Sequence, residues 1–350
     1  MHAQDTSTIQ VAPSIDGLPD STPLIDIPEQ LRSRWEADGV LYFRDVIDKD
    51  AVAALRREYM DRLKDVGVVA RDAEEPIWTG VDRVDGKQVR QIESALWRAL
   101  VTHPSLDRVV RTLIDSEPRW VPIVVHRSAP PTGPSSATNL FAGRHQDGHY
   151  NYGIEFITCW IPLMDIDQTV GGLAVAPGSH KGSLYDVPPG QSKPIAEGRI
   201  PDDAWRRPNY AAGDLLIFHS MTAHAGIPNT SGKLRLSVDV RFLPGSVPMP
   251  VVGTVSRIDG TTIHVTEESG KASQFDLDDA TIVRGPKATR VTGDQISEVI
   301  FEGADVLAVA DENGRAELVR SASRRFLDLP AAWFTELPAG WTGPAGKAAS

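Results

Sequence analysis

Apolar residues recur at helical spacing in the first third of the chain. A first helix is predicted to begin at Asp50, whose side chain can cap it, and to end near Gly67. Its apolar face consists of residues three or four positions apart: Val52, Leu55, Tyr59 and Leu63. Two further helices are predicted over residues 94–100 and, after the break that Pro104 makes, over residues 106–114.

Strand spacing replaces the helical period farther along the chain. Short apolar or alternating runs predict strands over residues 120–125, 155–163, 173–176, 215–218 and 234–242. Turns containing glycine, proline or aspartate separate most of them, as at Gly171-Gly172 and Gly213-Asp214. Short strands divided by turns and preceded by helices predict a mainly β fold with flanking helices, built on a jelly-roll, cupin-like core.

A second strand-rich part follows residues 243–250, whose sequence LPGSVPMP is typical of a linker. Its predicted strands and tight turns are residues 254–258, 262–266, 274–277 and 306–309, with turns at Asp259-Gly260, Ser269-Gly270 and Asn313-Gly314. We expect this part to fold as a small C-terminal β-barrel. The tail beyond it carries large aromatic side chains that need a surface to cover: Phe326, Trp333, Phe334 and Trp341.

These patterns divide the chain into four parts. Residues 1–25 are polar and expected to be flexible, residues 26–248 form the jelly-roll domain, residues 249–321 form the small β-barrel module, and residues 322–350 form the aromatic-containing tail. The module shows no convergent His, Asp or Glu cluster. The module is therefore interpreted as a lid, a substrate-capture surface or a contact between subunits of a homo-oligomer, and the alternative is a decoration without a role in turnover. The aromatic tail, which needs a surface to cover, favours a lid or a subunit contact.

The composition narrows the functions that the chain can have. With 350 residues, 41% hydrophobic residues and a formal net charge of −11, it is typical of an acidic globular protein, without the basic surface that a nucleic-acid partner requires. Its single cysteine, Cys159, excludes an intramolecular disulfide and a cysteine-rich zinc site. No secretory signal or membrane-spanning apolar run is visible, so we expect a cytoplasmic protein without a membrane partner.

One short motif is suited to bind a metal. In His145-Gln146-Asp147 an imidazole and a carboxylate lie two positions apart, and in an extended segment both side chains point to the same side. Two histidines and one carboxylate on one face of an octahedron leave three positions open, which is the arrangement of non-haem iron oxygenases. The triplet alone is common, and a surface turn is the alternative interpretation.

A second histidine must come from elsewhere, and residues 215–242 offer one. A predicted strand leads through a loop containing His219 and His224 to a strand that alternates strictly. The polar face of that strand consists of Arg235, Ser237, Asp239 and Arg241. On a surface strand this face would lie in water. In a barrel covered by helices it would line the interior, where Arg235 and Ser237 suit a buried carboxylate.

Several motifs together resemble the phytanoyl-CoA dioxygenase family over about residues 30–243. In chain order they are His145-Gln146-Asp147-Gly148 with Tyr150, Trp160-Ile161-Pro162-Leu163, Pro177-Gly178-Ser179-His180-Lys181, Gly213-Asp214, His224, Asn229 and Arg235. Upstream, a short helix at residues 35–38, a strand at residues 39–43 and a helix at residues 46–63 resemble the usual opening of the family. The spacing from His224 to Arg235 fits the family and that from His219 does not, so His224 is the preferred ligand.

The resemblance implies a double-stranded β-helix that binds Fe(II) and uses 2-oxoglutarate and O2 to oxidise a small-molecule substrate, releasing succinate and CO2. Carried over by position, its metal ligands are His145, Asp147 and His224. Arg235 would pair with the distal carboxylate of 2-oxoglutarate, with Ser237 as a second contact and Trp160 beside the cosubstrate. Gly226 departs from the family, because many members carry a hydroxyl residue two positions after the distal histidine.

Alternatives remain for the outcome and for the other histidines. The carboxylate of Asp147 favours hydroxylation over halogenation, whereas desaturation, cyclisation and epimerisation use the same ligands. The rival hypothesis is a cupin-like metal protein that binds or isomerises a ligand without oxidising 2-oxoglutarate. His149 is too distant along an extended segment to share a metal with His145, and His180 is expected to be a hydrogen-bonded turn residue. The acidic chain gives no support for a CoA thioester, so a free metabolite is the expected substrate.

Overall fold

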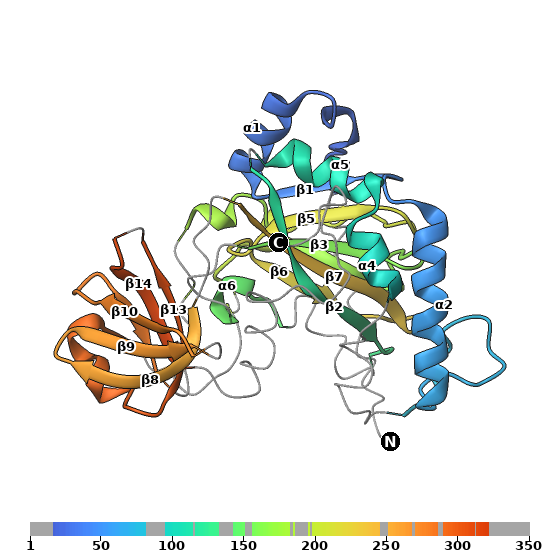
Figure 1. Ribbon diagram of the computed structural model, residues 1–350. Helices are drawn as coiled ribbons and strands as arrows, with labels where there is room; N and C mark the ends of the chain where they lie inside the picture. Colours follow the sequence, from blue (N-terminus) through green and yellow to red (C-terminus); the bar gives the residue numbers. More distant parts are fainter. Residues whose placement is uncertain are drawn as a thin grey trace, which may run out of the picture.

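The structure is a computed structural model that describes residues 17–81, 95–114, 116–132, 143–150, 156–182, 185, 195–196, 198–245, 251–267, 270–285, 290–311 and 313–321. Its elements form two strand-rich units, one before and one after residues 246–250 (Figure 1). Several predicted features lie outside the described residues: residues 1–16, most of the predicted linker, the turn residue Ser269 and the aromatic tail.

The first unit begins earlier than the predicted flexible segment allows. Residues 17–25 are described, and the amide of Ser21 donates a 2.7 Å hydrogen bond to the carbonyl of Tyr42. Ser21 is fully buried, and a short 3-10 turn, η1 (Thr22–Leu24), leads to the buried Ile25. The last nine residues of the predicted flexible segment therefore make contacts with the first unit, and this strand pairing satisfies backbone polar groups.

The helices of the first unit are α1 (Pro28–Asp38), α2 (Lys49–Asp65), α4 (Ala95–Val101), α5 (Pro104–Leu113) and the short α6 (Asp147–Tyr150). All four residues predicted for the apolar face of α2 are buried. The cap of α2 is Asp48 and not Asp50, since the Asp48 carboxylate accepts a 2.9 Å hydrogen bond from the amide of Ala51. Pro104 is the first residue of α5 and does not precede it. Proline suits this position because the N–H groups of the first helical turn have no acceptor within the helix, so the N–H that proline lacks is not needed there.

The main sheet of the first unit has five strands in the order β1-β5-β3-β7-β2. Their bounds are β1 (Val40–Phe43), β2 (Pro118–Ala129), β3 (Ile157–Pro162), β5 (Leu215–His219) and β7 (Arg235–Pro244). All neighbours are antiparallel. In Figure 1 α1 lies next to β1 and α4 next to β2, and their side chains share one apolar core with those of the strands. The helices therefore cover this sheet from outside.

A smaller sheet faces the first. It consists of β4 (Gly172–Val175) and β6 (His224–Ile227), and single bridges extend it to His145 and Arg206. The strand β6 lies where a loop was predicted. The side chain of Arg235 on β7 donates to the carbonyl of Gly172 on β4, which shows that the two sheets enclose a common interior. This mainly β arrangement with outer helices confirms the predicted jelly-roll core.

The second unit is one sheet of seven strands in the order β10-β9-β8-β13-β14-β11-β12. Their bounds are β8 (Val251–Asp259), β9 (Thr262–Glu267), β10 (Ala272–Asp276), β11 (Ile282–Arg284), β12 (Arg290–Thr292), β13 (Asp305–Ala310) and β14 (Ala316–Ser321). The predicted turns at Gly260 and Gly314 have φ values of 58° and 83°, which suit glycine. This unit has an apolar core of its own, around Val265, Val283 and Val306.

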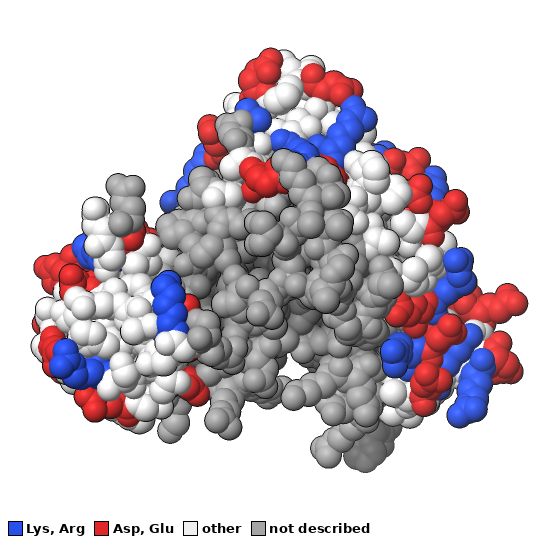
Figure 2. Space-filling model, in the orientation of Figure 1, with Lys and Arg blue, Asp and Glu red and all other residues white. Residues whose placement is uncertain are grey.

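Basic and acidic side chains are interleaved along the exposed side of α2 (Figure 2), as in Arg57, Asp61, Arg62 and Asp65. The face drawn there consequently has no continuous basic surface over this helix.

Among the described residues, none of the helices combines the length and the apolar character needed to cross a bilayer.

Candidate metal centre

Two histidines from distant parts of the chain are joined through their backbones. His145 precedes α6 and His224 is the first residue of β6. Each amide donates a 2.9 Å hydrogen bond to the carbonyl of the other residue. Residues paired in this way stand opposite each other in an antiparallel bridge. Their imidazole centroids lie 4.2 Å apart, so the main chain holds the two rings together.

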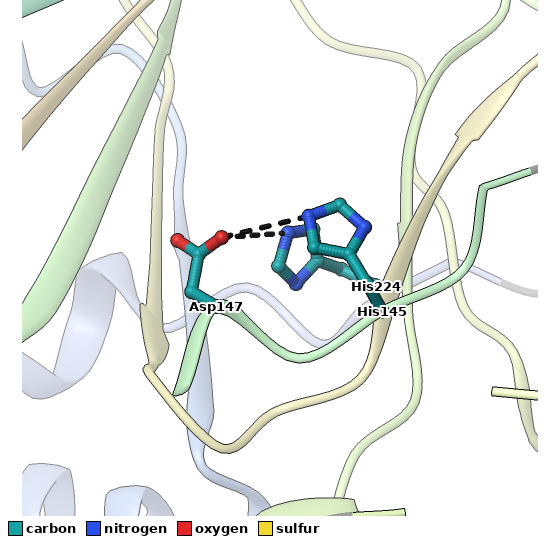
Figure 3. Close-up of side chains that lie close together, drawn as sticks. All are labelled: His145, Asp147 and His224. Carbon is teal, nitrogen blue, oxygen red and sulfur yellow. Dashed lines mark ion pairs between the residues drawn. The ribbon is translucent and has the colours of Figure 1, made fainter. Parts of the chain in front are cut away.

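Asp147 completes a cluster with the two histidines (Figure 3). Its Oδ1 lies 3.5 Å from Nε2 of His145 and 3.6 Å from Nε2 of His224. Within the part of the chain that the structure describes, these three residues are the one group of His, Cys, Asp or Glu whose donor atoms converge closely enough to hold a metal. The predicted extended geometry of the motif was wrong, because Asp147 is the first residue of α6 and turns toward His145 through the start of that helix.

Hydrogen bonds select the nitrogen that each histidine presents. Nδ1 of His145 lies 2.7 Å from the carbonyl oxygen of Gly143, and Nδ1 of His224 lies 3.0 Å from that of Thr222. A carbonyl oxygen only accepts, so each Nδ1 carries the proton and donates it. The lone pair of each Nε2 is then directed at Asp147 and the space between the rings. A metal requires this tautomer when Nε2 is the ligand.

The charge state of the cluster also suits a metal. Burial alone would raise the pKa of Asp147, but the guanidinium charge of Arg241 helps to hold that pKa well below its usual range. Burial lowers the pKa of His224 to about 4. Near neutral pH the cluster therefore offers an ionised carboxylate and a neutral imidazole, which are the forms that bind a metal.

The polar face of β7 points into the interior, as one of the two interpretations of its alternation predicted. Its four residues are less than a tenth exposed: Arg235, Ser237, Asp239 and Arg241. The Nη1 of Arg235 donates to the carbonyl of Gly172 at 2.5 Å, whereas its Nε and the hydroxyl of Ser237 have no hydrogen-bond partner among the described residues. Burial lowers the pKa of Arg235 to about 10, so the guanidinium stays charged. A buried charge with unused donors beside an unused hydroxyl fits a carboxylate ligand.

In a comparison with protein families, the family described as "Phytanoyl-CoA dioxygenase (PhyH)" matches residues 35–237 of this chain. The chain belongs to this family. The match includes all three residues of the cluster, together with Arg235 and Ser237. It ends before β8, so the seven-stranded unit lies outside the family region.

Two curated proteins and one solved structure illustrate what this chain is similar to. The 1-deoxypentalenic acid 11-beta-hydroxylase of Streptomyces exfoliatus is 29% identical over 252 residues, which are 65% of this chain and 85% of the relative. The ectoine dioxygenase of Bordetella bronchiseptica is 24% identical over 219 residues, which are 59% of this chain and 64% of the relative. Among solved structures, the epimerase SnoN in complex with Fe3+, alpha ketoglutarate and nogalamycin RO has a TM-score of 0.46 and 22% identity, covering 63% of this chain and 85% of that chain.

Phytanoyl-CoA dioxygenases are iron enzymes that consume 2-oxoglutarate and O2, and the residues present here fit these cofactors. Two nitrogen donors and one carboxylate oxygen are the ligand set of a facial iron site. The unused donors of Arg235 and Ser237 provide a place for a second, anionic component. This chain is therefore an Fe(II)- and 2-oxoglutarate-dependent dioxygenase. The family match favours this function over that of a cupin-like metal protein that does not oxidise 2-oxoglutarate.

The remaining residues singled out in the sequence lie close to this site or apart from it. Trp160 is buried on β3, and its ring centroid lies 4.7 Å from that of Tyr210. A Cβ added at Gly226 would lie 4.0 Å from Nη1 of Arg235, so a hydroxyl residue there would stand beside the guanidinium. The ring of His219 packs against those of Trp35 and His180, outside the cluster. The side chain of His149 lies outside what the structure describes.

Sequence reasoning missed the residues that support Asp147. Its second oxygen, Oδ2, accepts a 3.2 Å hydrogen bond from the hydroxyl of Thr158 and lies 3.5 Å from Nη2 of Arg241. The same Nη2 lies 3.6 Å from Asp239, to which Arg127 on β2 also donates. The alternation of β7 did indicate the inward direction of Arg241 and Asp239, but not what they contact. Their partners depend on how the strands pair, which a single sequence does not show.

Proposed function

We propose that this dioxygenase hydroxylates a small molecule, with His145, Asp147 and His224 as the metal ligands and Arg235 as the anchor of 2-oxoglutarate. The observation that carries the proposal is the combination of three convergent donors with a buried guanidinium whose Nε has no partner in the part of the chain that the structure describes. A binding protein needs no second charged pocket beside its metal. An oxygenase that consumes a dicarboxylate does.

The protein residues then have separate tasks. His145 and His224 present Nε2 because their Nδ1 protons are bound to carbonyls. Arg235 would bind the distal carboxylate, Ser237 would supply a second hydrogen bond, and Trp160 would border the cosubstrate from β3. Iron bound at the cluster would supply the activation of O2, coupled to conversion of 2-oxoglutarate into succinate and CO2.

A free metabolite is the proposed class of substrate. The hydroxylase and the dioxygenase found among the relatives are both named after small molecules, 1-deoxypentalenic acid and ectoine. The retained carboxylate of Asp147 supports hydroxylation as the outcome, because it occupies the position that halogenating relatives leave open. The net charge of −11 supports neither a CoA thioester nor a nucleic acid as the substrate.

The test is succinate release in the presence of Fe(II), 2-oxoglutarate and pools of small metabolites. At least one pool is expected to stimulate succinate formation and to yield a product that gains one oxygen atom, measured by mass spectrometry. Omission of iron or of 2-oxoglutarate is the control and should abolish both signals. Metal-dependent conversion of a metabolite without any consumption of 2-oxoglutarate would instead support the cupin-like alternative.

We also propose a division into domains near residue 248, with residues 26–248 as the oxygenase, 249–321 as an autonomous module and 322–350 as a tail that covers part of the surface. The separate core around Val265 supports the division. We infer that the module closes into a small barrel, and the bridge that joins Asp276, at the end of β10, to Arg315, just before β14, supports this closure. Its proposed role is that of a lid or a subunit contact.

Removing the module tests this division. A chain that ends at Val247 is expected to retain iron and 2-oxoglutarate binding, because every proposed ligand lies in residues 145–237. Binding is measured by titration, with the full chain as the control and circular dichroism as the check of folding. Gel filtration of both chains reports whether the module forms a subunit contact. A soluble, folded shortened chain that binds no metal would contradict the two-domain proposal.

A further inference from the structure

We propose that Thr158 and Arg241 form a cradle that decides which oxygen of Asp147 faces the metal and keeps that carboxylate a one-oxygen ligand. The inference rests on the proposed metal site and extends it to residues that do not touch the metal. It assigns both residues a positioning role, since each would act through Asp147.

The cradle is built by strand register. Thr158 on β3 and Arg241 on β7 stand directly opposite each other in the antiparallel ladder. Side chains at opposed positions of a ladder project to the same face and lie close together. Both reach the same atom, Oδ2 of Asp147, at 3.2 Å from the Thr158 hydroxyl and 3.5 Å from Nη2 of Arg241. The sheet thus presents one neutral donor and one charged donor to a single oxygen.

The two oxygens of Asp147 consequently have different surroundings. Oδ1 faces the Nε2 atoms of both histidines, and Oδ2 faces the cradle. A carboxylate that binds a metal through both oxygens would have to give up the cradle contacts of Oδ2. Their loss would leave the buried guanidinium of Arg241 without this partner, which is costly in a protein interior. The cradle therefore favours ligation through Oδ1 alone, so that more metal positions stay open.

Arg241 is itself held in place from two further directions. Its Nη2 lies 3.6 Å from Oδ2 of Asp239, and its guanidinium carbon lies 5.6 Å from the centre of the Phe156 ring. Arg127, on β2, donates to the same oxygen of Asp239 at 2.7 Å. Acidic and basic groups therefore alternate from Asp147 through Arg241 and Asp239 to Arg127. The direct contacts with Asp239 and Phe156 hold the guanidinium in place before any metal arrives.

The position of Asp147 explains why it needs such support. His145 and His224 are held by backbone hydrogen bonds to each other. Asp147 is the first residue of α6, outside the strands of both sheets. The cradle supplies from β3 and β7 the orientation that the bridge supplies to the histidines.

The experiment measures Co(II) binding by the full chain in the absence of 2-oxoglutarate, using a competing chelator and the visible absorption band of bound Co(II). Arg241→Gln is expected to weaken Co(II) binding by about 10–100-fold, which is typical when a residue that holds a metal ligand is lost. It should also change the absorption band, because the carboxylate becomes free to use both oxygens. Thr158→Val, with nearly unchanged volume, should shift the band in the same direction with a smaller loss of affinity. Arg241→Lys, which keeps the charge, should recover part of the affinity.

Arg127→Gln is the matched control, because Arg127 carries the same charge and shares Asp239 with Arg241, whereas the 3.5 Å contact with Asp147 belongs to Arg241. Its Co(II) affinity should stay within about twofold of the unchanged chain, a difference of less than 1 kcal/mol. Equal losses in Arg127→Gln and Arg241→Gln would overturn the cradle, because loss of positive charge alone would then explain them. Unchanged affinity and spectrum in folded Arg241→Gln and Thr158→Val would overturn it as well. If Arg241→Gln does not fold, Thr158→Val alone decides by its spectrum.

The proposed function has a separate readout. If the wild-type protein binds Co(II) and the His224→Ala variant does not, the proposed metal site is supported. This conclusion is independent of the results for the Thr158 and Arg241 variants. If neither the unchanged chain nor any variant binds Co(II), the metal site fails and the cradle fails with it.

Discussion

His224→Ala is expected to abolish both iron binding and turnover while the protein remains folded. The imidazole of His224 is one of three donors in the cluster, and its Nε2 is directed at the metal position by the hydrogen bond from Nδ1 to Thr222. Two remaining donors do not make a facial set, so activity should fall to the level of the metal-free chain. Iron content after dialysis, succinate formation and thermal unfolding together measure the effect. The backbone bridge to His145 does not involve the imidazole and should persist.

His219→Ala is the matched control for that variant. Both histidines lie on the same stretch of chain, but the ring of His219 packs against Trp35 and its Nδ1 accepts a hydrogen bond from the amide of Met221. It should retain iron binding and lose only some stability. The assignment of the third ligand is wrong if His219→Ala loses iron and His224→Ala keeps it.

Arg235→Gln should raise the 2-oxoglutarate requirement by about a hundredfold or more, because breaking a buried charged pair typically costs about 3–5 kcal/mol. The guanidinium is buried, its Nε has no hydrogen-bond partner within the described ranges, and the side chain already donates to the carbonyl of Gly172, which fixes its direction. Glutamine keeps part of the length and polarity but removes the charge. Iron affinity should change little, because Arg235 is not among the three proposed metal ligands.

Ser237→Ala gives the comparison for Arg235. It removes one neutral hydrogen bond at a fully buried position two residues along β7. The 2-oxoglutarate requirement should rise by about tenfold, as for the loss of one hydrogen bond of about 1.4 kcal/mol. Binding of 2-oxoglutarate to the iron-loaded chain is measured by titration. An unchanged requirement in Arg235→Gln would refute its role as the anchor.

The sequence predicts best those features that depend on local period. The strict alternation of residues 234–242 predicts an amphipathic strand, and Arg235 and Ser237 are indeed buried on its polar face. The helical spacing of Val52, Leu55, Tyr59 and Leu63 likewise predicts the buried side of α2. In both cases the side chains that share a face are set by the geometry of one element, so no knowledge of its neighbours is needed.

Features that depend on pairing were missed. The strand β6 has four residues, and its sequence His-Ala-Gly-Ile shows no alternation long enough to distinguish it from a loop. Its conformation comes from hydrogen bonds with β4 and with His145. The contacts of Thr158 and Arg241 with Asp147 depend on the register between β3 and β7 in the same way. Strands β11 and β12, of three residues each, also exist because of their neighbours.

The backbone bridge between His145 and His224 has a consequence for the protein when the proposed metal site is empty. Its two hydrogen bonds join the histidine-bearing segments without any contribution from the ion. Loss of the ion therefore leaves the strands in place, which slow exchange of these two amide hydrogens in chelated protein would report. On this proposal, the site can be emptied and refilled while the main chains of both segments stay paired.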